Sequence, residues 1–421
     1  MDPGQQRLVL VGGSGSSVVD DVGRSYLDLR AGTLNATVGY GHPTVVRALS
    51  RQAAVLMTWD LAEVTTEPAA LLAERIADLL PDGLSRTLLC NSGSEATEAA
   101  VKIARQWHEL NRRPERTWVL SFGDGYHGAT ALGIATTSSP FRREGAGPLP
   151  GGFAHLDTPR CTVCLTEPGH AGDCEIPGPA RWEEQMLRLG PDRIAAVLVE
   201  PVLSVGGVIV PPPGHLRGLR DLCEKYGIVL ICDEVATGFG RTGRWFGFEH
   251  ELGPQAGPDI VTTAKGLAGG YAPLSAVTVR QDIYQAFAKD PLLGGLRHGH
   301  TTGGHATACA AALAVLDVVR DQDLVRAAAD RGAQLLRGLQ PLRRFDGVRE
   351  VRGRGLLVGV EMVSLQAAAD VAAAAHARGV LVRHFGPVLT LAPPLVITEQ
   401  EIAAGVAAVT DAVAAAVGGQ R

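Results

Sequence analysis

The sequence predicts an α/β protein with a mostly parallel sheet, joined to a smaller α+β domain. Short apolar strands alternate with helices before Gly304, and that order is typical of βαβ units. From Gly304 onward, long alanine-rich helices surround only two strand-like runs, so the pattern of helices and strands changes there. At 421 residues, the chain is long enough for two domains, or for one large domain with a cap.

The N-terminal segment predicts a hairpin followed by two helices. Polar turn residues interrupt an apolar pattern within residues 18–30, which indicates a hairpin. Apolar residues at helical spacing predict amphipathic helices at residues 42–56 and 68–83.

The strands of the predicted sheet follow, each leading into a helix or a glycine-rich loop. They are expected at residues 87–90, 118–122, 194–199, 228–233 and 260–263, with a helix at 216–227. In the second part, helices are expected at 305–319 and 324–339, strands at 355–362 and 379–385, and a last helix near the C-terminus.

Composition excludes some classes of partner. A net charge of −5 gives no electrostatic reason to expect nucleic acid or an acidic membrane surface. We find no apolar run that approaches bilayer-spanning length, and the N-terminus lacks the features of a signal peptide. The odd number of cysteines, seven, fits a reducing compartment better than a disulfide framework. We therefore expect a cytoplasmic protein with no nucleic-acid or membrane partner.

A turn between a strand and a helix forms the first candidate site. Asn91, Ser92, Gly93 and Ser94 follow the strand that ends at Cys90. Backbone N–H groups at a helix start attract phosphate, and Ser94 adds a hydroxyl. Simple helix capping by serine is the alternative.

Two further strand ends carry ring-binding or charged residues. Tyr126 and His127 stand between glycines after the strand at 118–122, where a planar ligand could stack. Asp233 ends an apolar strand, so its carboxylate needs a cationic partner. The alternatives are an ordinary glycine-rich turn for the first and a helix cap for the second.

Lys265 is the lysine whose surroundings differ from those of the others. The chain has only four lysines, and three of them, Lys102, Lys225 and Lys289, stand among polar residues or beside a glutamate. Lys265 instead follows a strand and is flanked by small apolar residues. A desolvated lysine loses proton affinity and becomes a nucleophile toward carbonyls, which is the function we predict for it.

Together these motifs resemble the class III aminotransferases, the ω-aminotransferase group of pyridoxal-phosphate enzymes of fold type I. The resemblance covers nearly the whole chain. Its segments are YLDLRAGTLNATVGYGHP, NSGSEATEAAVKIAR, GYHG, EPVLSVGGVIVPPPG, DEVATGFGRTG, TTAKGLAGG, HGHTTGGHATACAAALAVL, VRGRGLLVGVEM and LAPPLVIT.

The resemblance implies a seven-stranded large domain and a small domain built from both termini. The implied boundaries are 1–45 for the N-terminal part of the small domain, 46–304 for the large domain and 305–421 for the C-terminal part. It also implies pyridoxal 5'-phosphate as cofactor and a homodimer with active sites at the subunit interface. The substrates would be small amines and keto acids.

The resemblance assigns a role to each candidate residue. Lys265 would be the Schiff-base lysine, Asp233 would pair with the pyridine nitrogen, and Glu200 would lie beside Asp233 and support it. Thr301 would reach the phosphate of the neighbouring subunit. The remaining cofactor-binding residues would be Ser92, Gly93 and Ser94 at the phosphate, with Tyr126, His127 and Val235 around the ring.

The chain departs from members of the family that use glutamate. Those members carry an arginine where Thr390 stands, an acid at Val205 and a glutamine at Ala236. Losing the arginine and its acid together leaves no unpaired charge. This favours an amine or ω-amino acid as donor and pyruvate, rather than 2-oxoglutarate, as acceptor.

Three residues are candidates for substrate binding. Arg383 could bind a substrate carboxylate, because it precedes the PPL strand by a short hairpin. A surface arginine is the equal alternative. Leu34 and Trp59 are expected at the mouth of the site.

Other functions remain open from the sequence. An epimerase, an aminomutase or a dialkylglycine decarboxylase of the same family would share the cofactor residues. A catalytically inactive binding protein of this fold is the alternative from another class, although it would have no need of Lys265.

The spacing of Cys161, Cys164, His170 and Cys174 is close to that of a zinc knuckle. A structural zinc there is the less favoured interpretation, since cysteines are common in this segment of the family without a catalytic metal. We expect no metal in the chemistry.

Overall fold

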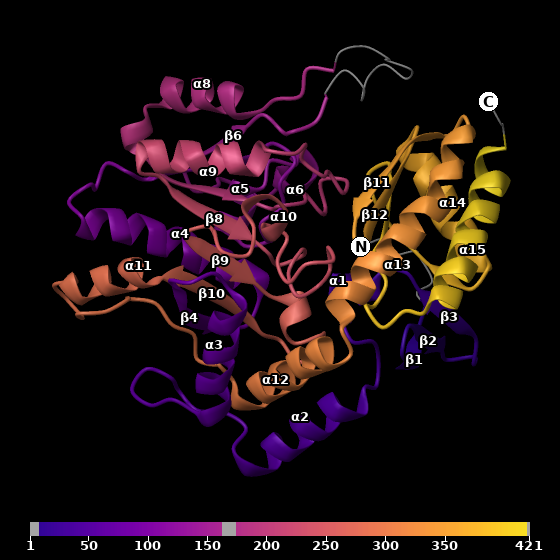
Figure 1. Cartoon of the computed structure of the whole chain (residues 1–421), viewed down its shortest axis with the longest axis horizontal. Coiled ribbons are helices and arrows are strands. Elements are labelled where there is room, and N and C mark those ends of the chain that lie inside the picture. Colours follow the sequence, from indigo (N-terminus) through magenta and orange to yellow (C-terminus); the bar gives the residue numbers. More distant parts are fainter. Residues whose placement is uncertain (1–7, 162–173, 419–421) are drawn as a thin grey trace.

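A computed structural model describes residues 8–161 and 174–418. It has two lobes (Figure 1), a larger one around a seven-stranded sheet and a smaller one that carries the C-terminal helices. Because residues 162–173 lie outside the described part, Cys164 and His170 cannot be placed, and the zinc prediction stays a prediction.

The large sheet has the strand order β4-β10-β9-β8-β7-β5-β6. All neighbouring strands run parallel except around β10, which is antiparallel to both β4 and β9. This confirms the predicted α/β fold with a mostly parallel seven-stranded sheet. The strands are β4 (Leu84–Cys90), β5 (Trp118–Phe122), β6 (Phe153–Leu156), β7 (Ile194–Val199), β8 (Val229–Asp233), β9 (Ile260–Thr263) and β10 (Ser275–Arg280).

Helices cover both faces of this sheet. On β7, Ala196 and Leu198 pack in the cluster of α4, whereas Val197 and Val199 pack in the cluster of α9. Every residue of β7 is therefore buried, as expected for a parallel sheet covered on both sides. The helices of this lobe are α2 (Pro43–Val55), α3 (Glu67–Leu79), α4 (Gly93–Leu110), α5 (Ala131–Thr136), α6 (Pro140–Arg143), α8 (Pro179–Leu189), α9 (His215–Tyr226), α10 (Glu249–Leu252), α11 (Gln281–Ala286) and α12 (Ala306–Asp321).

The two ends of the chain meet in one sheet of order β1-β2-β3-β13. The predicted hairpin is present as β2 and β3, and β3 pairs in parallel with β13 from the C-terminal part. The short helix α1 (Ala31–Leu34) follows β3 directly. The strands are β1 (Leu10–Ser14), β2 (Ser17–Asp20), β3 (Ser25–Asp28) and β13 (Val380–Leu381).

A second small sheet has the order β11-β12-β15-β14 and is antiparallel throughout. Residues 379–385, expected as one strand, are divided: β13 pairs with β3 and β14 pairs with β15. The buried Val382 separates the two halves, so the chain changes sheets there. The strands are β11 (Val348–Arg354), β12 (Leu357–Met362), β14 (Arg383–Phe385) and β15 (Val388–Leu391).

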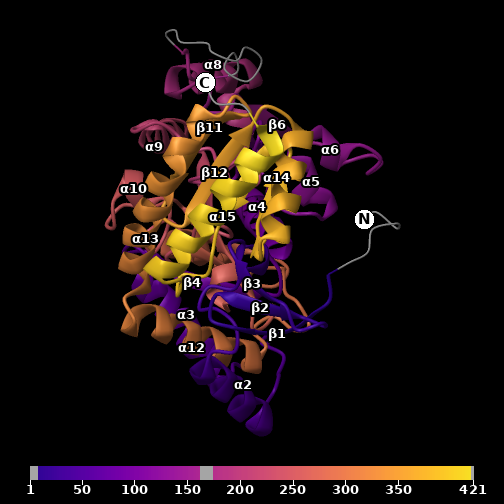
Figure 2. The ribbon, with the colours of Figure 1, turned by 90° about the vertical axis from the view of Figure 1, so that its right-hand side faces the viewer.

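Three helices cover this small sheet: α13 (Leu324–Leu339), α14 (Leu365–Ala377) and α15 (Glu399–Val417). Figure 2 shows them side by side in front of β11 and β12. Helix α12 lies between the lobes, because its Cys309 and Leu316 belong to the large core and its Val315 and Val319 to the small one. The proposed domain boundary at residues 304/305 thus falls just before a helix shared by both cores.

Helix α15 corrects one expectation from the sequence. An 18-residue window of this helix reaches a mean hydropathy of 1.3, so length and composition alone would allow it to cross a bilayer. In the fold, Ile402, Val409 and Val413 are buried in the small core, and α15 packs on α13 and α14. This packing buries 28% of the window, so it accounts for one face of the helix.

His108 is buried where α4 meets the sheet. Its side chain is 0% exposed and its Nε2 lies 2.9 Å from the carbonyl oxygen of Ala195. Since that oxygen can only accept, Nε2 carries the proton and Nδ1, which has no partner, does not. Burial lowers the pKa of His108 to about 4, and the nearby Arg113 and Arg116 act in the same direction.

We expect this histidine to make the fold sensitive to mild acid. Between pH 6.5 and 4 the unfolded chain binds a proton at His108 and the folded chain does not, so the free energy of unfolding falls as pH drops, by up to about 3 kcal/mol. His108→Gln keeps a donor for Ala195 but cannot titrate. Urea unfolding at pH 6.5 and 4.5 should show a smaller loss in the variant, and equal losses would contradict the assignment.

Candidate active site

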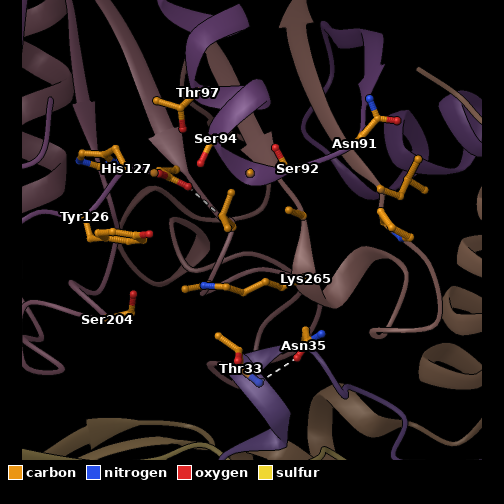
Figure 3. A pocket seen from close by; sticks show the side chains of 18 of the residues that line it. Thr33, Asn35, Asn91, Ser92, Ser94, Thr97, Tyr126, His127, Ser204 and Lys265 are labelled. Atoms are coloured by element: carbon orange, nitrogen blue, oxygen red, sulfur yellow. Dashed lines mark hydrogen bonds and ion pairs between the residues drawn. The ribbon is translucent and has the colours of Figure 1, made fainter. Parts of the chain in front are cut away.

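A cavity of about 450 Å³ lies at the carboxyl-terminal edge of the large sheet. This is the edge at which open α/β sheets bind ligands. Figure 3 shows Lys265 crossing the cavity, with Tyr126, His127 and Ser204 on one side and Thr33 and Asn35 near the base of the view. The predicted site residues that line the cavity are Ser92, Gly93, Ser94, Tyr126, His127, Glu200, Asp233, Val235 and Lys265.

The other predicted residues do not line this cavity. Leu34 is buried in a small apolar cluster with Ala236, while its neighbours Thr33 and Asn35 line the cavity instead. Trp59 is 54% exposed. Thr301 is exposed and lines a separate hollow, and Arg383 lies on β14 of the small lobe.

The start of α4 is built to receive an anion. Ser92 caps the helix by accepting from the N–H of Glu95 at 3.3 Å. Because Ser92 is the capping residue, Ser94 remains available for a ligand. The Oγ of Ser94 accepts from the N–H of Ala129 at 3.0 Å. Within the described residues, the backbone N–H groups of Gly93 and Ser94 have no acceptor, which leaves the positive end of an 18-residue helix open to the cavity.

Two glycines shape this corner. A Cβ on Gly93 would lie 3.0 Å from Cγ1 of Val235, and one on Gly128 would lie 2.7 Å from Oγ of Ser94. Gly128 also has φ +123°, which other residues rarely adopt. Gly93 therefore lets Val235 approach the helix start, and Gly128 lets its own loop approach Ser94.

Asp233 is held by three donors at the end of β8. Its Oδ2 lies 2.8 Å from Nδ1 of His127, and its Oδ1 accepts from the N–H of Val235 at 3.1 Å and from Oγ1 of Thr262 at 3.2 Å. The carboxylate is 3% exposed. A buried carboxylate in such a network is fixed in direction and can receive a further positive donor from the cavity.

Glu200 lies close enough to Asp233 to feel its charge, and it also holds the neighbouring loop. Its Oε2 accepts from the N–H of Tyr126 at 3.0 Å, and its Oε1 accepts from the N–H and hydroxyl of Ser204 at 2.9 and 2.6 Å. His127, not Glu200, makes the hydrogen bond to Asp233. Burial raises the pKa of Glu200, and the charge of Asp233 adds to that effect. Glu200 thus fixes the loop that carries Tyr126.

Lys265 stands at the end of β9 in a strained conformation. Its φ of +38° is in the left-handed region, where a residue with a side chain is uncommon outside functional sites. Burial lowers the pKa of Lys265, while the carboxylates of Glu200 and Asp233 raise it. Its Nζ has no hydrogen-bond or ion-pair partner within residues 8–161 and 174–418, so the amine is available to a ligand.

Arg383 and Thr390 are direct neighbours. They form a cross-strand pair of β14 and β15, so their side chains share one face of the small sheet. Within the described residues, Nη1 of Arg383 and Oγ1 of Thr390 are both buried without a hydrogen-bond partner. Arg383 therefore lies next to Thr390, the position at which we expect members of the family that use glutamate to carry an arginine.

Comparison with known proteins identifies the family. A family model described as aminotransferase class-III matches residues 1–413. The chain belongs to the class-III aminotransferases. Taurine–pyruvate aminotransferase of Bilophila wadsworthia is 36% identical over 415 residues, which cover 94% of this chain and 89% of that protein.

Two further proteins are similar to this class-III aminotransferase over nearly its whole length. Acetylornithine aminotransferase of Methanopyrus kandleri is 38% identical over 409 residues, covering 97% of this chain and 95% of that protein. The PLP-bound crystal structure of an amine transaminase from an uncultivated Pseudomonas species has a TM-score of 0.91 and 36% identity, covering 98% of this chain and 95% of that one. The expected fold, enzyme class and pyridoxal 5'-phosphate cofactor are thereby confirmed.

The cavity of this class-III aminotransferase fits that cofactor. The open N–H groups at the start of α4 suit its phosphate, and Asp233 suits a protonated ring nitrogen. A buried hydroxyl without a partner, that of Thr97, lines the same corner. The unpaired amine of Lys265 suits its aldehyde carbon.

Sequence reasoning missed several residues of the cavity. Thr97 lies one helical turn after Ser94, and Ser204 lies four residues after Glu200, so their spacing was a usable signal. Thr33 and Asn35 gave none, because tertiary packing brings them to the cavity: β3, just before them, pairs with β13, and Asn35 lies beside Gly270.

Proposed function

We propose that this class-III aminotransferase moves an amino group from an amine or ω-amino acid to a keto acid, with pyruvate preferred, in a ping-pong reaction. The observation that carries the proposal is Lys265: its unpaired, strained amine lies in the same cavity as Asp233 and the open start of α4. Pyridoxal phosphate, when bound, supplies an electron sink for the substrate carbon.

The residues of the chain divide the remaining tasks. Lys265 would hold the cofactor through Nζ, and its amine would move a proton as a neutral base, which its lowered pKa supports. Asp233 would keep a proton on the ring nitrogen, and His127 and Thr262 keep Asp233 oriented. Gly93 and Ser94 would bind the phosphate. Glu200 positions Tyr126 by its hydrogen bond to the backbone.

The preference for pyruvate is supported by the pair Arg383 and Thr390. Thr390, not a second arginine, stands opposite Arg383, and the half-buried Val205 offers no acid. The missing cation at residue 390 disfavours 2-oxoglutarate, which has a second carboxylate to bind, more than pyruvate, which has one. A relative named for taurine and pyruvate agrees with this choice.

A homodimer is supported by the exposed surface. Large apolar side chains gather on α2, on the loop after it and on the loop after α11: Val46, Val55, Leu56, Met57, Trp59, Leu292 and Leu293. A hollow of about 730 Å³ beside them is lined by Thr301 and His300. We propose that a second copy covers this surface, which would bring Thr301 to the partner's phosphate and Trp59 to a substrate site.

Four buried free thiols, Cys90, Cys223, Cys232 and Cys309, agree with a cytoplasmic location.

The first test removes the amine. Lys265→Ala should abolish transamination and the cofactor linkage that borohydride reduces, as followed by peptide mass. Lys225→Ala, at a surface lysine paired with Glu183 at 2.6 Å, should keep both. A reducible linkage in the Lys265→Ala protein would refute the assignment, and carbon dioxide or racemised donor without keto product would indicate another reaction of the family.

The second test compares acceptors. With one amine donor, kcat/KM for pyruvate should exceed that for 2-oxoglutarate by roughly tenfold or more, since one charge-assisted hydrogen bond contributes about 1.5–3 kcal/mol. A clear preference for 2-oxoglutarate would contradict the roles given to Val205 and Thr390.

The third test addresses the dimer. The native protein should sediment as twice the 44.0 kDa chain, and Val55→Asp should shift it toward monomer and weaken cofactor binding. Val22→Asp changes an equally apolar exposed side chain, 70% exposed, on the N-terminal hairpin and should change neither. A wild-type monomer with full activity would exclude the dimer.

A further inference from the structure

Arg142 lies beside Tyr126, and two further arginines from separate parts of the chain, Arg30 and Arg383, interact electrostatically in the same surroundings. Arg142 on α6 places its Cζ 4.5 Å from the centre of the Tyr126 ring. Burial lowers the pKa of Arg383, and the positive charges of Arg30 and Arg142 lower it further. We call Arg30, Arg142 and Arg383 the arginine cluster.

None of these arginines is neutralised by a carboxylate of the described residues. Arg30 donates through Nε to the carbonyl of Gly32 at 2.8 Å; among the described residues, the Arg142 side chain has no hydrogen-bond acceptor and the buried Nη1 of Arg383 has no partner. Arg352, on β11 of the same small sheet as Arg383, and Arg160, in the loop after β6, differ because both pair with Glu361. The arginine cluster is therefore a local excess of partly buried positive charge.

Such an excess is unfavourable unless a ligand offsets it. Like charges in a partly desolvated place repel each other, and an anion that enters removes both the repulsion and the missing hydrogen bonds. Guanidinium groups bind carboxylates and sulfonates through paired N–H donors. The positive charge of the arginine cluster therefore favours an anion as its ligand.

The position of Arg142 is fixed by its neighbour in α6. Arg143 donates through Nη1 to Nε2 of His155 at 3.0 Å. The Oγ of Ser121 donates to the carbonyl of Thr136 at 2.6 Å, so the proton between Ser121 and His155 belongs to Nδ1 of the histidine. Burial lowers the pKa of His155 to about 4, and at neutral pH the ring therefore accepts from Arg143 and anchors α6.

We propose that Arg142 is a specificity-determining residue that binds, together with Arg383, an acidic group at the far end of the amino donor. Tyr126 lines the cavity and Arg142 stands over its ring, outside the cavity lining. An acid bound there is separated from the amine that reacts at Lys265. The donor class is an ω-amino acid with a terminal carboxylate or sulfonate, and this inference rests on the proposed function.

The experiment compares charged and neutral donors without an acceptor. Holoenzyme is mixed with 3-aminopropanoate, 2-aminoethanesulfonate or butylamine, and the cofactor absorbance follows the first half-reaction. Arg142→Gln should raise the half-saturating concentration of the two acidic donors roughly 10- to 100-fold and leave that of butylamine within about twofold. Arg142→Lys keeps the charge and should lie between these values.

A binding measurement and a control complete the test. Ethanesulfonate, which has no amine, should raise the Tm of the wild-type holoenzyme and have little effect on the Arg142→Gln holoenzyme. Arg193→Gln removes another arginine that lies over a ring, 5.5 Å from Trp118 at the far end of β5, and should behave as wild type in both measurements.

The outcomes separate this inference from the proposed function. If the wild type reacts with acidic and neutral donors and Arg142→Gln weakens both equally or neither, the role of Arg142 is refuted while transamination stands. If the wild type reacts with no donor, the proposed function fails first.

Discussion

The buried hydrogen bond between Asp233 and His127 is the interaction on which the site depends. An apolar strand delivers the carboxylate to a sheet edge almost without water, where an unpartnered charge would cost several kcal/mol. The 2.8 Å contact meets that requirement and fixes the loop after β5. Glu200 holds the same loop one residue earlier, at the N–H of Tyr126. Asp233 and Glu200 therefore fix one wall of the cavity through separate hydrogen bonds.

The sequence predicted those site residues whose position follows from the local order of strand and turn. Lys265, Asp233 and Ser94 each stand where a strand meets a turn, and the topology of a parallel sheet brings such turns to one edge. Arg142 was not predictable in this way. It lies on α6, away from the strand ends, and it meets Tyr126 through tertiary packing, with the adjacent Arg143 bonded to His155. The hydrogen bond from the backbone of Tyr126 to Glu200 was not predictable for the same reason, since such a partner is decided by tertiary packing.

Outside the site, too, the sequence did not predict which strands pair with each other. Helix and strand positions followed from periodicity, but the division of residues 379–385 between two sheets did not. A single apolar run cannot show that its two halves have different partners. Helix α15 shows a related case, because its composition alone suits a bilayer, whereas in the fold one face of it packs on α13 and α14.

The pairing of β3 with β13 has a consequence for the order in which the chain becomes functional. Thr33 and Asn35 leave the ribosome early, yet the strand that holds their segment in place is made near the end of synthesis. Leu395, which is made later still, donates its N–H to the carbonyl of Thr37 in the same segment. The segment that carries Thr33 and Asn35 therefore has all of its partners only when nearly the whole chain has been made.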